Sequence, residues 1–206
     1  MSLRERKKLA TRKALIETAR HMFAERGYDN VTLEDICETV PVHTTTFFSY
    51  FGSKEELAFS YQLDALAAFR VLLKERPPGS DVVSLWWSFR DNFGQQERGE
   101  ESRVLTQMDH VPALRNRQAD IVRQYVEEIS QALAEGEGGG AADELYSTLY
   151  ASAMMAVYLA AARWFAGKFG REIESSDTSV FTKLIMSKFP SLDEIEAEFK
   201  RLRRAA

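Results

Sequence analysis

The sequence predicts an all-α fold, because helix signals recur along the whole chain and strand signals are scarce. Apolar residues repeat at intervals of three and four, which is the period of a half-buried helix. Capping residues mark several helix starts, and Gly or Pro marks several ends. A Pro-Pro-Gly stop at 77–79 is the clearest boundary. We therefore expect a small N-terminal domain at 1–54 and a larger one at 55–206, joined by a helix at about 53–76.

Short helices are expected throughout the N-terminal domain. The first has an apolar row that ends at Phe23, and Gly27 stops it. Thr32 is suited to cap the second helix, which Pro41 ends, because the residue before proline is pushed out of the helical region. A third helix fits 43–51. The tight turn between the second and third helices makes this a helix-turn-helix unit.

The remaining helices follow from their caps and breaks. Ser53-Lys54-Glu55-Glu56 is a capping box that opens the linking helix. Further helices are expected at about 80–96, at 102–110, from Pro112 onward, at 142–169, from Asp177 and from Ser191. The glycine-rich segment 136–140 is expected to be a flexible loop. It loosely fits a dinucleotide-binding pattern, which we reject because no strand precedes it.

Composition and charge exclude several classes of protein. The 206 residues are 45% hydrophobic and 28% charged, as in soluble globular proteins, and no apolar run could span a membrane. A signal peptide is not evident, and the single Cys37 cannot form an internal disulfide, so we expect a cytoplasmic protein. The chain has a net charge of −4, yet residues 1–54 carry nine Lys and Arg against seven Asp and Glu. The basic end suggests a polyanionic partner, and an ordinary solvated helix face is the alternative.

The stretch VHTTTFFSYFGSK at 42–54 sets hydroxyl groups beside aromatic rings. On a helical wheel Phe47 and Phe51 share one side, whereas Thr45 and Ser49 point the opposite way. The rings would hold this helix to its own domain while the hydroxyl groups project outward. Such a helix fits the major groove of DNA, where threonine can form a hydrogen bond or touch a thymine methyl. A solvated helix whose threonines bind nothing is the alternative.

Several motifs follow one another between residues 11 and 57. TRKALIETARHMFAERGYDNVTLEDICETV is followed by TTTFFSYFGSKEEL. The informative positions are Thr11-Arg12, the Phe23 to Tyr28 helix end, Thr32 with Ile36, and the closing Phe48, Phe51 and Lys54. Together they resemble the DNA-binding domain of the TetR family of transcriptional regulators. The rest of the chain is similar to that family in length and helix layout only.

This resemblance implies DNA contacts for a set of N-terminal residues. It places four residues at the DNA backbone, namely Thr32, Thr44, Tyr50 and Lys54. It places four others toward the groove, namely His43, Thr45, Thr46 and Ser49. Lys7, Lys8 and Arg12 on the N-terminal arm are expected to neutralise phosphates.

The chain departs from the family pattern at the turn and in the third helix. Val40-Pro41-Val42 replaces the usual glycine turn, and His43-Thr44-Thr45 replaces the usual Ser-Lys-Gly. Phe48 stands where the family has a tyrosine, which removes the hydroxyl of a common phosphate contact. Because this helix has no Arg or Lys before Lys54, we expect hydroxyl, imidazole and methyl contacts to read the bases.

The resemblance also implies a ligand cavity and a dimer interface in the larger domain. The candidate cavity residues are Trp86, Phe89, Phe93, Gln107, His110, Tyr125, Met154 and Tyr158. Their composition suits a bulky apolar or aromatic effector, although such a stripe is also typical of a plain core. The candidate interface residues are Ala153, Ala156, Ala160, Val180, Phe181, Leu184 and Ile185. They would form a four-helix interface between two copies of the chain.

No catalytic residue, metal ligand set or cofactor is expected. None of His21, His43 and His110 follows a Glu at the spacing of a di-iron site, and known phosphate-loop, zinc-protease and serine-hydrolase motifs are absent from the sequence. The resemblance implies a dimeric repressor that an effector releases from a palindromic operator in double-stranded DNA. One alternative is a small-molecule-binding helical protein or enzyme of this fold without DNA binding. Another is an activator or nucleoid-type DNA binder without an effector.

Overall fold

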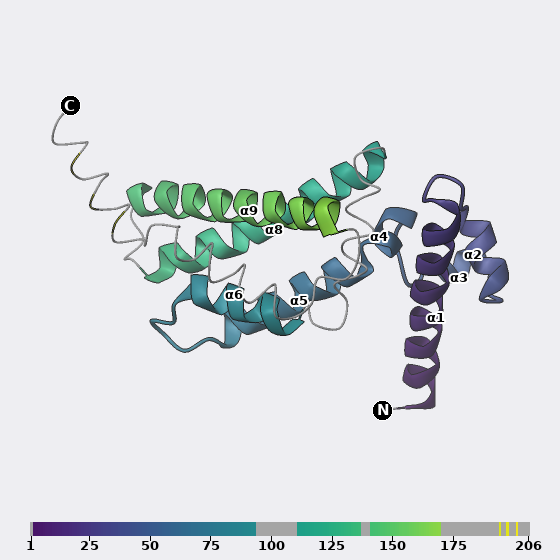
Figure 1. Ribbon diagram of the computed structural model, residues 1–206. Helices are drawn as coiled ribbons and strands as arrows, with labels where there is room; N and C mark the ends of the chain where they lie inside the picture. Colours follow the sequence, from purple (N-terminus) through teal and green to yellow (C-terminus); the bar gives the residue numbers. More distant parts are fainter. Residues whose placement is uncertain are drawn as a thin grey trace.

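A computed structural model describes residues 2–93, 111–136 and 141–169, with the isolated helical positions Glu194, Ala197 and Arg201. All regular elements in these ranges are helices, which confirms the all-α prediction (Figure 1). They are α1 (Leu3–Arg26), α2 (Leu33–Thr39), α3 (Thr44–Phe47), α4 (Lys54–Ala58), α5 (Ser60–Glu75), α6 (Val82–Phe93), α8 (Pro112–Gly136) and α9 (Ala141–Phe169). The helices expected at 102–110, from Asp177 and from Ser191 lie outside the described ranges, apart from the isolated positions.

The ends of α1 and α2 lie where their capping residues predict. Gly27 follows α1 with φ of 80°, a conformation that favours glycine, and its N–H donates to the carbonyl of Phe23. Thr32 caps α2 in a reciprocal box: its hydroxyl accepts from the N–H of Asp35, whose carboxylate accepts from the N–H of Thr32. These caps fix where α1 ends and where α2 begins, and α2 packs against α1 as the helix-turn-helix prediction requires.

The third helix is shorter than the expected range of 43–51. α3 contains four residues, and the chain leaves it through a tight turn in which the N–H of Ser49 donates to Thr46 and that of Tyr50 donates to Phe47. The rings of Phe47 and Phe51 nevertheless face inward, with exposures of 0% and 2% and a centroid separation of 5.6 Å. Burial of both rings therefore fixes the recognition segment, residues 43–51, even though only Thr44–Phe47 of it are helical.

The linking helix expected at 53–76 is broken into α4 and α5 at Phe59. The Phe59 backbone has φ of −100° and ψ of 15°, and its ring is 1% exposed. Ser53 caps α4 as expected, by accepting a hydrogen bond from the N–H of Glu56. The return bond differs from the predicted box, because the Glu56 carboxylate accepts from the N–H of Gly52. The break at Phe59 accompanies the burial of its ring in the core.

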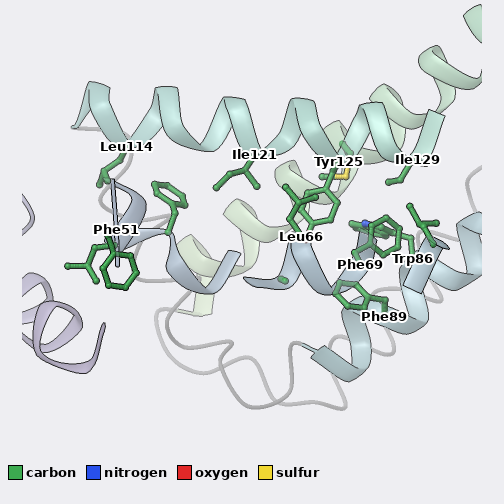
Figure 2. Packing of buried hydrophobic residues seen from close by; sticks show 14 of the residues in the cluster. Phe51, Leu66, Phe69, Trp86, Phe89, Leu114, Ile121, Tyr125 and Ile129 are labelled. Atoms are coloured by element: carbon green, nitrogen blue, oxygen red, sulfur yellow. The ribbon is translucent and has the colours of Figure 1, made fainter. Parts of the chain in front are cut away.

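The larger group of helices packs α5 and α6 beneath α8, with α9 lying along α8 (Figure 1). Pro112 is the first residue of α8, as predicted. Aromatic side chains from three helices fill this core, and Figure 2 shows Phe69 of α5, Trp86 and Phe89 of α6 and Tyr125 of α8 close together. The α4 helix contacts both α1 and α8, so one continuous core joins the N-terminal helices to the larger group.

Candidate nucleic-acid interface

The recognition segment turns its rings inward and a polar face outward. His43, Thr45, Phe48 and Ser49 are exposed, whereas Thr44, Thr46 and Tyr50 are half-buried. Phe47 is fully buried beneath them. This is the division of sides that the helical wheel predicts, and it leaves a compact surface at the exposed end of the helix-turn-helix unit.

Phe48 is the large apolar side chain on this surface. It is 54% exposed, and its ring stands edge-on to the buried ring of Phe47, at 5.4 Å between centroids and 85° between planes. Phe47 in turn packs against Phe51. The exposed ring therefore rests on the buried Phe47 ring, which Phe51 holds in turn, and this arrangement favours a fixed orientation.

Hydroxyl groups near this surface already have partners within the domain. Ser49 Oγ donates to the carbonyl of Thr46 at 2.6 Å. Thr32 Oγ1 accepts from the N–H of Asp35 at 3.1 Å, and the hydrogen bond from the Thr32 backbone lowers the pKa of the Asp35 carboxyl group. Both hydroxyl oxygens retain further acceptor capacity, so they remain candidates for contacts with DNA.

Lys54, which the resemblance places at the DNA backbone, has its ammonium group held by partners within its own domain. Its Nζ donates to the carbonyl of Tyr28 at 2.6 Å and lies 3.9 Å from the centroid of the Tyr28 ring. The Tyr28 hydroxyl donates to Glu55 Oε1 at 2.8 Å. Burial lowers the pKa of Lys54 and, together with the Glu55 hydrogen bond, raises the pKa of Tyr28. The cluster fastens the start of α4 to the turn after α1.

Arg12 also has an internal partner that the sequence did not indicate. Its Nη2 donates to Asp64 Oδ1 at 2.8 Å, and its guanidinium carbon lies 5.3 Å from the centroid of the Phe51 ring. Asp64 belongs to α5 and lies outside every motif noted in the sequence. Lys7 and Lys8 are exposed on the same helix as Arg12. The N-terminal arm therefore offers these lysines to solvent, whereas Arg12 joins α1 to α5.

The expected cavity residues that the structure describes are packed into the core. Trp86, Phe89, Tyr125 and Met154 are buried, and Tyr158 is half-buried. The Trp86 and Tyr158 rings meet edge-on at 5.0 Å. The side chain of Phe93 and all of Gln107 and His110 lie outside the described residues. The fold therefore brings most of the described cavity candidates into one cluster, and the role of this cluster in ligand binding stays a prediction.

Arg90 adds a charged group to this aromatic cluster. It donates from Nη2 to the Tyr158 hydroxyl, and its guanidinium carbon lies 4.9 Å from the centroid of that ring. Arg90 lies one helical turn after Trp86, and this spacing is the sequence signal that could have identified it.

A separate groove of about 590 Å³ lies between the end of α5, the 76–80 turn and α8. Its walls include the ion pairs Arg70–Glu128 and Arg76–Glu135, at 2.6 and 2.7 Å.

The outer face of α9 carries the alanines expected at a dimer interface. Ala153, Ala156 and Ala160 are exposed, and Leu145 and Leu149 on the same helix are each 59% exposed. The opposite side of α9 buries Tyr150, Ala151, Met154 and Met155. The other interface candidates, Val180, Phe181, Leu184 and Ile185, lie outside the described residues.

The described residues contain no cluster of His, Cys, Asp and Glu side chains that could hold a metal ion. Among the helices in these ranges, none has both the length and the apolarity that a membrane span requires.

The N-terminal fold and its exposed face define a helix-turn-helix protein with a second, all-helical domain. Residues 15–61 match the family model described as bacterial regulatory proteins, tetR family. The HTH-type transcriptional regulator TcmR of Streptomyces glaucescens is 39% identical over 99 residues, which are 48% of this chain and 44% of that relative. The chain thus spans less than half the length of this relative. The match over residues 15–61 confirms the resemblance to the DNA-binding domain of the TetR family that the sequence shows.

Solved structures with the same helix layout extend the likeness over most of the chain. NalD, the secondary repressor of the MexAB-OprM multidrug efflux pump in Pseudomonas aeruginosa, has a TM-score of 0.59 at 19% identity, covering 88% of this chain and 96% of that chain. Thermus thermophilus FadR, a repressor solved in complex with lauroyl-CoA, has a TM-score of 0.54 at 17% identity, covering 87% and 95%. At these identities the likeness shows the fold, with its N-terminal helix-turn-helix domain and its C-terminal helical domain.

Proposed function

We propose that this protein is a transcriptional repressor that binds a palindromic DNA operator as a homodimer and is released by a small molecule. The observation that carries the proposal is an exposed face, here called the recognition face, that consists of His43, Thr45, Phe48 and Ser49. It lies above the buried rings of Phe47 and Phe51. This face has the size and position at which helix-turn-helix proteins meet the major groove. Because its target is DNA, we place the protein in the cytoplasm.

Affinity for DNA would come mainly from the phosphates. Lys7 and Lys8 are exposed on α1, and Thr32 lies exposed at the start of α2. Lysine contacts of this kind supply sequence-independent affinity that weakens as salt rises. Half-buried Thr44 and Tyr50 would complete the backbone contacts at the edges of the recognition face.

The homodimer would form through the outer face of α9. Leu145 and Leu149 are exposed there in line with Ala153 and Ala156, so two copies of α9 could approach closely over an apolar stripe. Such a stripe is costly to leave in water. A two-fold dimer would present two recognition faces to two half-sites of a palindrome.

The effector would bind within the C-terminal helices, near the aromatic cluster of Trp86, Tyr125 and Tyr158. The support is the composition of this cluster together with the fold relative FadR, whose structure contains lauroyl-CoA. We propose a bulky, largely apolar or aromatic molecule, and we propose no catalytic role for the protein.

Release from DNA would follow from a shift of α5 relative to α1. Arg12 connects these helices through Asp64, and α5 also contacts α8 and α6. A ligand that binds one arrangement of α5, α6 and α8 better than another would shift the population toward it. The recognition faces of the dimer would then lose the spacing that consecutive grooves require.

The experiment that tests this function is a selection of genomic DNA fragments by the purified full-length protein at near-physiological salt. Recovery of a palindrome supports the repressor, and small molecules can then be screened for release of that duplex. A folded dimer that enriches no DNA and retains no small molecule would contradict the proposal. It would favour the alternative of a carrier or enzyme without DNA binding.

A further inference from the structure

We propose that the recognition face identifies its operator through thymine methyl groups, with Phe48 as the principal reader and the methyl group of Thr45 beside it. This inference rests on the proposed function, because it requires that the face enter a major groove. It specifies what the face recognises there, and it makes Phe48 a specificity-determining residue.

The recognition segment lacks the side chains that most often read bases by hydrogen bonds. Residues 42–53 contain no Arg, Lys, Asn or Gln. Guanine and adenine are usually read by bidentate hydrogen bonds from those four residue types. Two cations of the same domain, Arg12 and Lys54, are held by Asp64 and by the carbonyl of Tyr28. The face therefore cannot use the usual bidentate recognition of purines.

The Phe48 ring is the large apolar group that the face exposes. Phe48 is 54% exposed and stands edge-on to Phe47, which is fully buried. Thr45 lies three positions earlier, which places it on the same side of the segment. In the major groove the thymine C5-methyl is the apolar feature of the base edges. A ring fixed in this orientation would gain by covering that methyl group, because both surfaces leave water.

The hydroxyl groups around the Phe48 ring are only partly available to bases. The proton of Ser49 Oγ is donated to the carbonyl of Thr46 at 2.6 Å, so Ser49 meets a base only as an acceptor. Thr46 is half-buried beside it. The exposed side-chain donors of the face are then His43 and Thr45. Most of the surface that can reach the centre of a groove is the Phe48 ring and the Thr45 side chain.

The test uses two random duplex libraries, one made with thymine and one with uracil, which lacks only the C5-methyl group. The full-length protein should enrich a thymine-containing half-site from the first library and bind it more weakly in its uracil form. Removal of one contacted methyl should weaken binding about fourfold, which corresponds to one buried carbon. Binding to duplexes with a single uracil then locates each methyl contact.

Substitutions in the face identify the side chain that contacts the thymine methyl groups. Phe48→Ala should lower the affinity and remove most of the penalty for uracil, whereas Phe48→Tyr should keep the penalty because it keeps the ring. Thr45→Ser keeps the hydroxyl but loses the methyl, so it should reduce the penalty in part. Val71→Ala is the matched control, because Val71 is also 54% exposed but lies on α5. Val71→Ala should change neither the affinity for DNA nor the penalty for uracil.

The possible outcomes separate this inference from the proposed function. Equal binding of the thymine and uracil forms of the operator would overturn methyl readout while leaving DNA binding in place. A uracil penalty that persists at full size in both Phe48→Ala and Thr45→Ser would overturn the assignment of the readers. If neither library yields an enriched sequence and the folded protein retains no small molecule, the proposed function fails and this inference fails with it.

Discussion

Arg12 of α1 and Asp64 of α5 form an ion pair across the boundary between the recognition helices and the larger group, with 2.8 Å between Nη2 and Oδ1. The two side chains are 32% and 51% exposed. A pair this accessible to water contributes at most about 1 kcal/mol to stability. Its importance is geometric, because Arg12 also stacks on Phe51 and so connects α5 to the support of the recognition segment.

Replacement of Arg12 by Met should leave the salt dependence of DNA binding almost unchanged. Because Arg12 is paired with Asp64 rather than with a phosphate, its loss should not change the number of counterions that DNA binding releases. Lys8→Met on the same helix is the comparison, and it should reduce the slope of log affinity against log salt by about 1. The slopes follow from binding curves at several salt concentrations. A reduction of about 1 for Arg12→Met would instead show that Arg12 leaves Asp64 for a phosphate.

Phe47 and Phe48 are adjacent in sequence but should differ sharply in their effect on folding. Phe47 is 0% exposed and Phe48 is 54% exposed. Phe47→Ala should lower the free energy of unfolding by about 3 kcal/mol or more, because it leaves a cavity between α3 and the core. Phe48→Ala should lower it by only about 1 kcal/mol, the scale of the edge-on contact with Phe47. Urea unfolding of both variants measures the difference, and equal losses would contradict the assignment of inner and outer faces.

The inner face of the recognition segment could be predicted because it depends on local spacing. Phe47 and Phe51 are four positions apart, and Thr32 and Gly27 carry the capping chemistry of helix ends. Both rings are buried, and both caps form the expected hydrogen bonds. Periodicity and capping act over a few residues, so a single sequence contains the information.

The partners of Arg12 and Lys54 could not be predicted in the same way. Asp64 lies 52 positions from Arg12, and Tyr28 lies 26 positions from Lys54. Such pairs depend on how helices cross, and no local pattern encodes the crossing. The break at Phe59 has the same origin, since the apolar row continues through it in sequence and the burial of its ring is a tertiary effect.

Asp35→Asn should alter the acid dependence of stability through the cap of α2. Hydrogen bonding by the Thr32 backbone lowers the pKa of Asp35 in the folded protein. The resulting stabilisation is present above the ordinary carboxyl pKa of about 4 and is lost as pH falls through the lower folded value. Asp35→Asn should therefore be less stable than the wild type at neutral pH and approach it once the pH falls below the lowered pKa of Asp35 in the folded protein.

Urea unfolding across this pH range measures the effect of Asp35. Glu38→Gln removes an exposed carboxylate from the same helix and controls for the loss of one negative charge. A constant difference in stability between Asp35→Asn and the wild type at all pH values would contradict the role of the ionised cap.

Leu149→Glu should convert the proposed dimer into a monomer. Leu149 is 59% exposed on the outer face of α9, so the substitution should be tolerated in the folded monomer. Two α9 helices packed through this face would bury the new carboxylates without a partner, which is strongly unfavourable. Sedimentation velocity reports the mass of each species. Val71→Glu on α5 is the control and should remain dimeric, and a dimeric Leu149→Glu variant would exclude this face as the interface.

Lys54→Met should weaken the fold without changing the salt dependence of DNA binding. Lys54 Nζ donates to the carbonyl of Tyr28 at 2.6 Å and lies 3.9 Å from the centroid of the Tyr28 ring, which fastens α4 to the end of α1. Loss of this hydrogen bond and of the cation–π contact should lower the free energy of unfolding by about 1–2 kcal/mol. Urea unfolding and the salt slope, measured on the same variant beside Lys8→Met, distinguish the two roles of the ammonium group. Unchanged stability with a slope reduced by about 1 would show that Lys54 serves a phosphate, and reduced stability with an unchanged slope would show that it holds the position of α4.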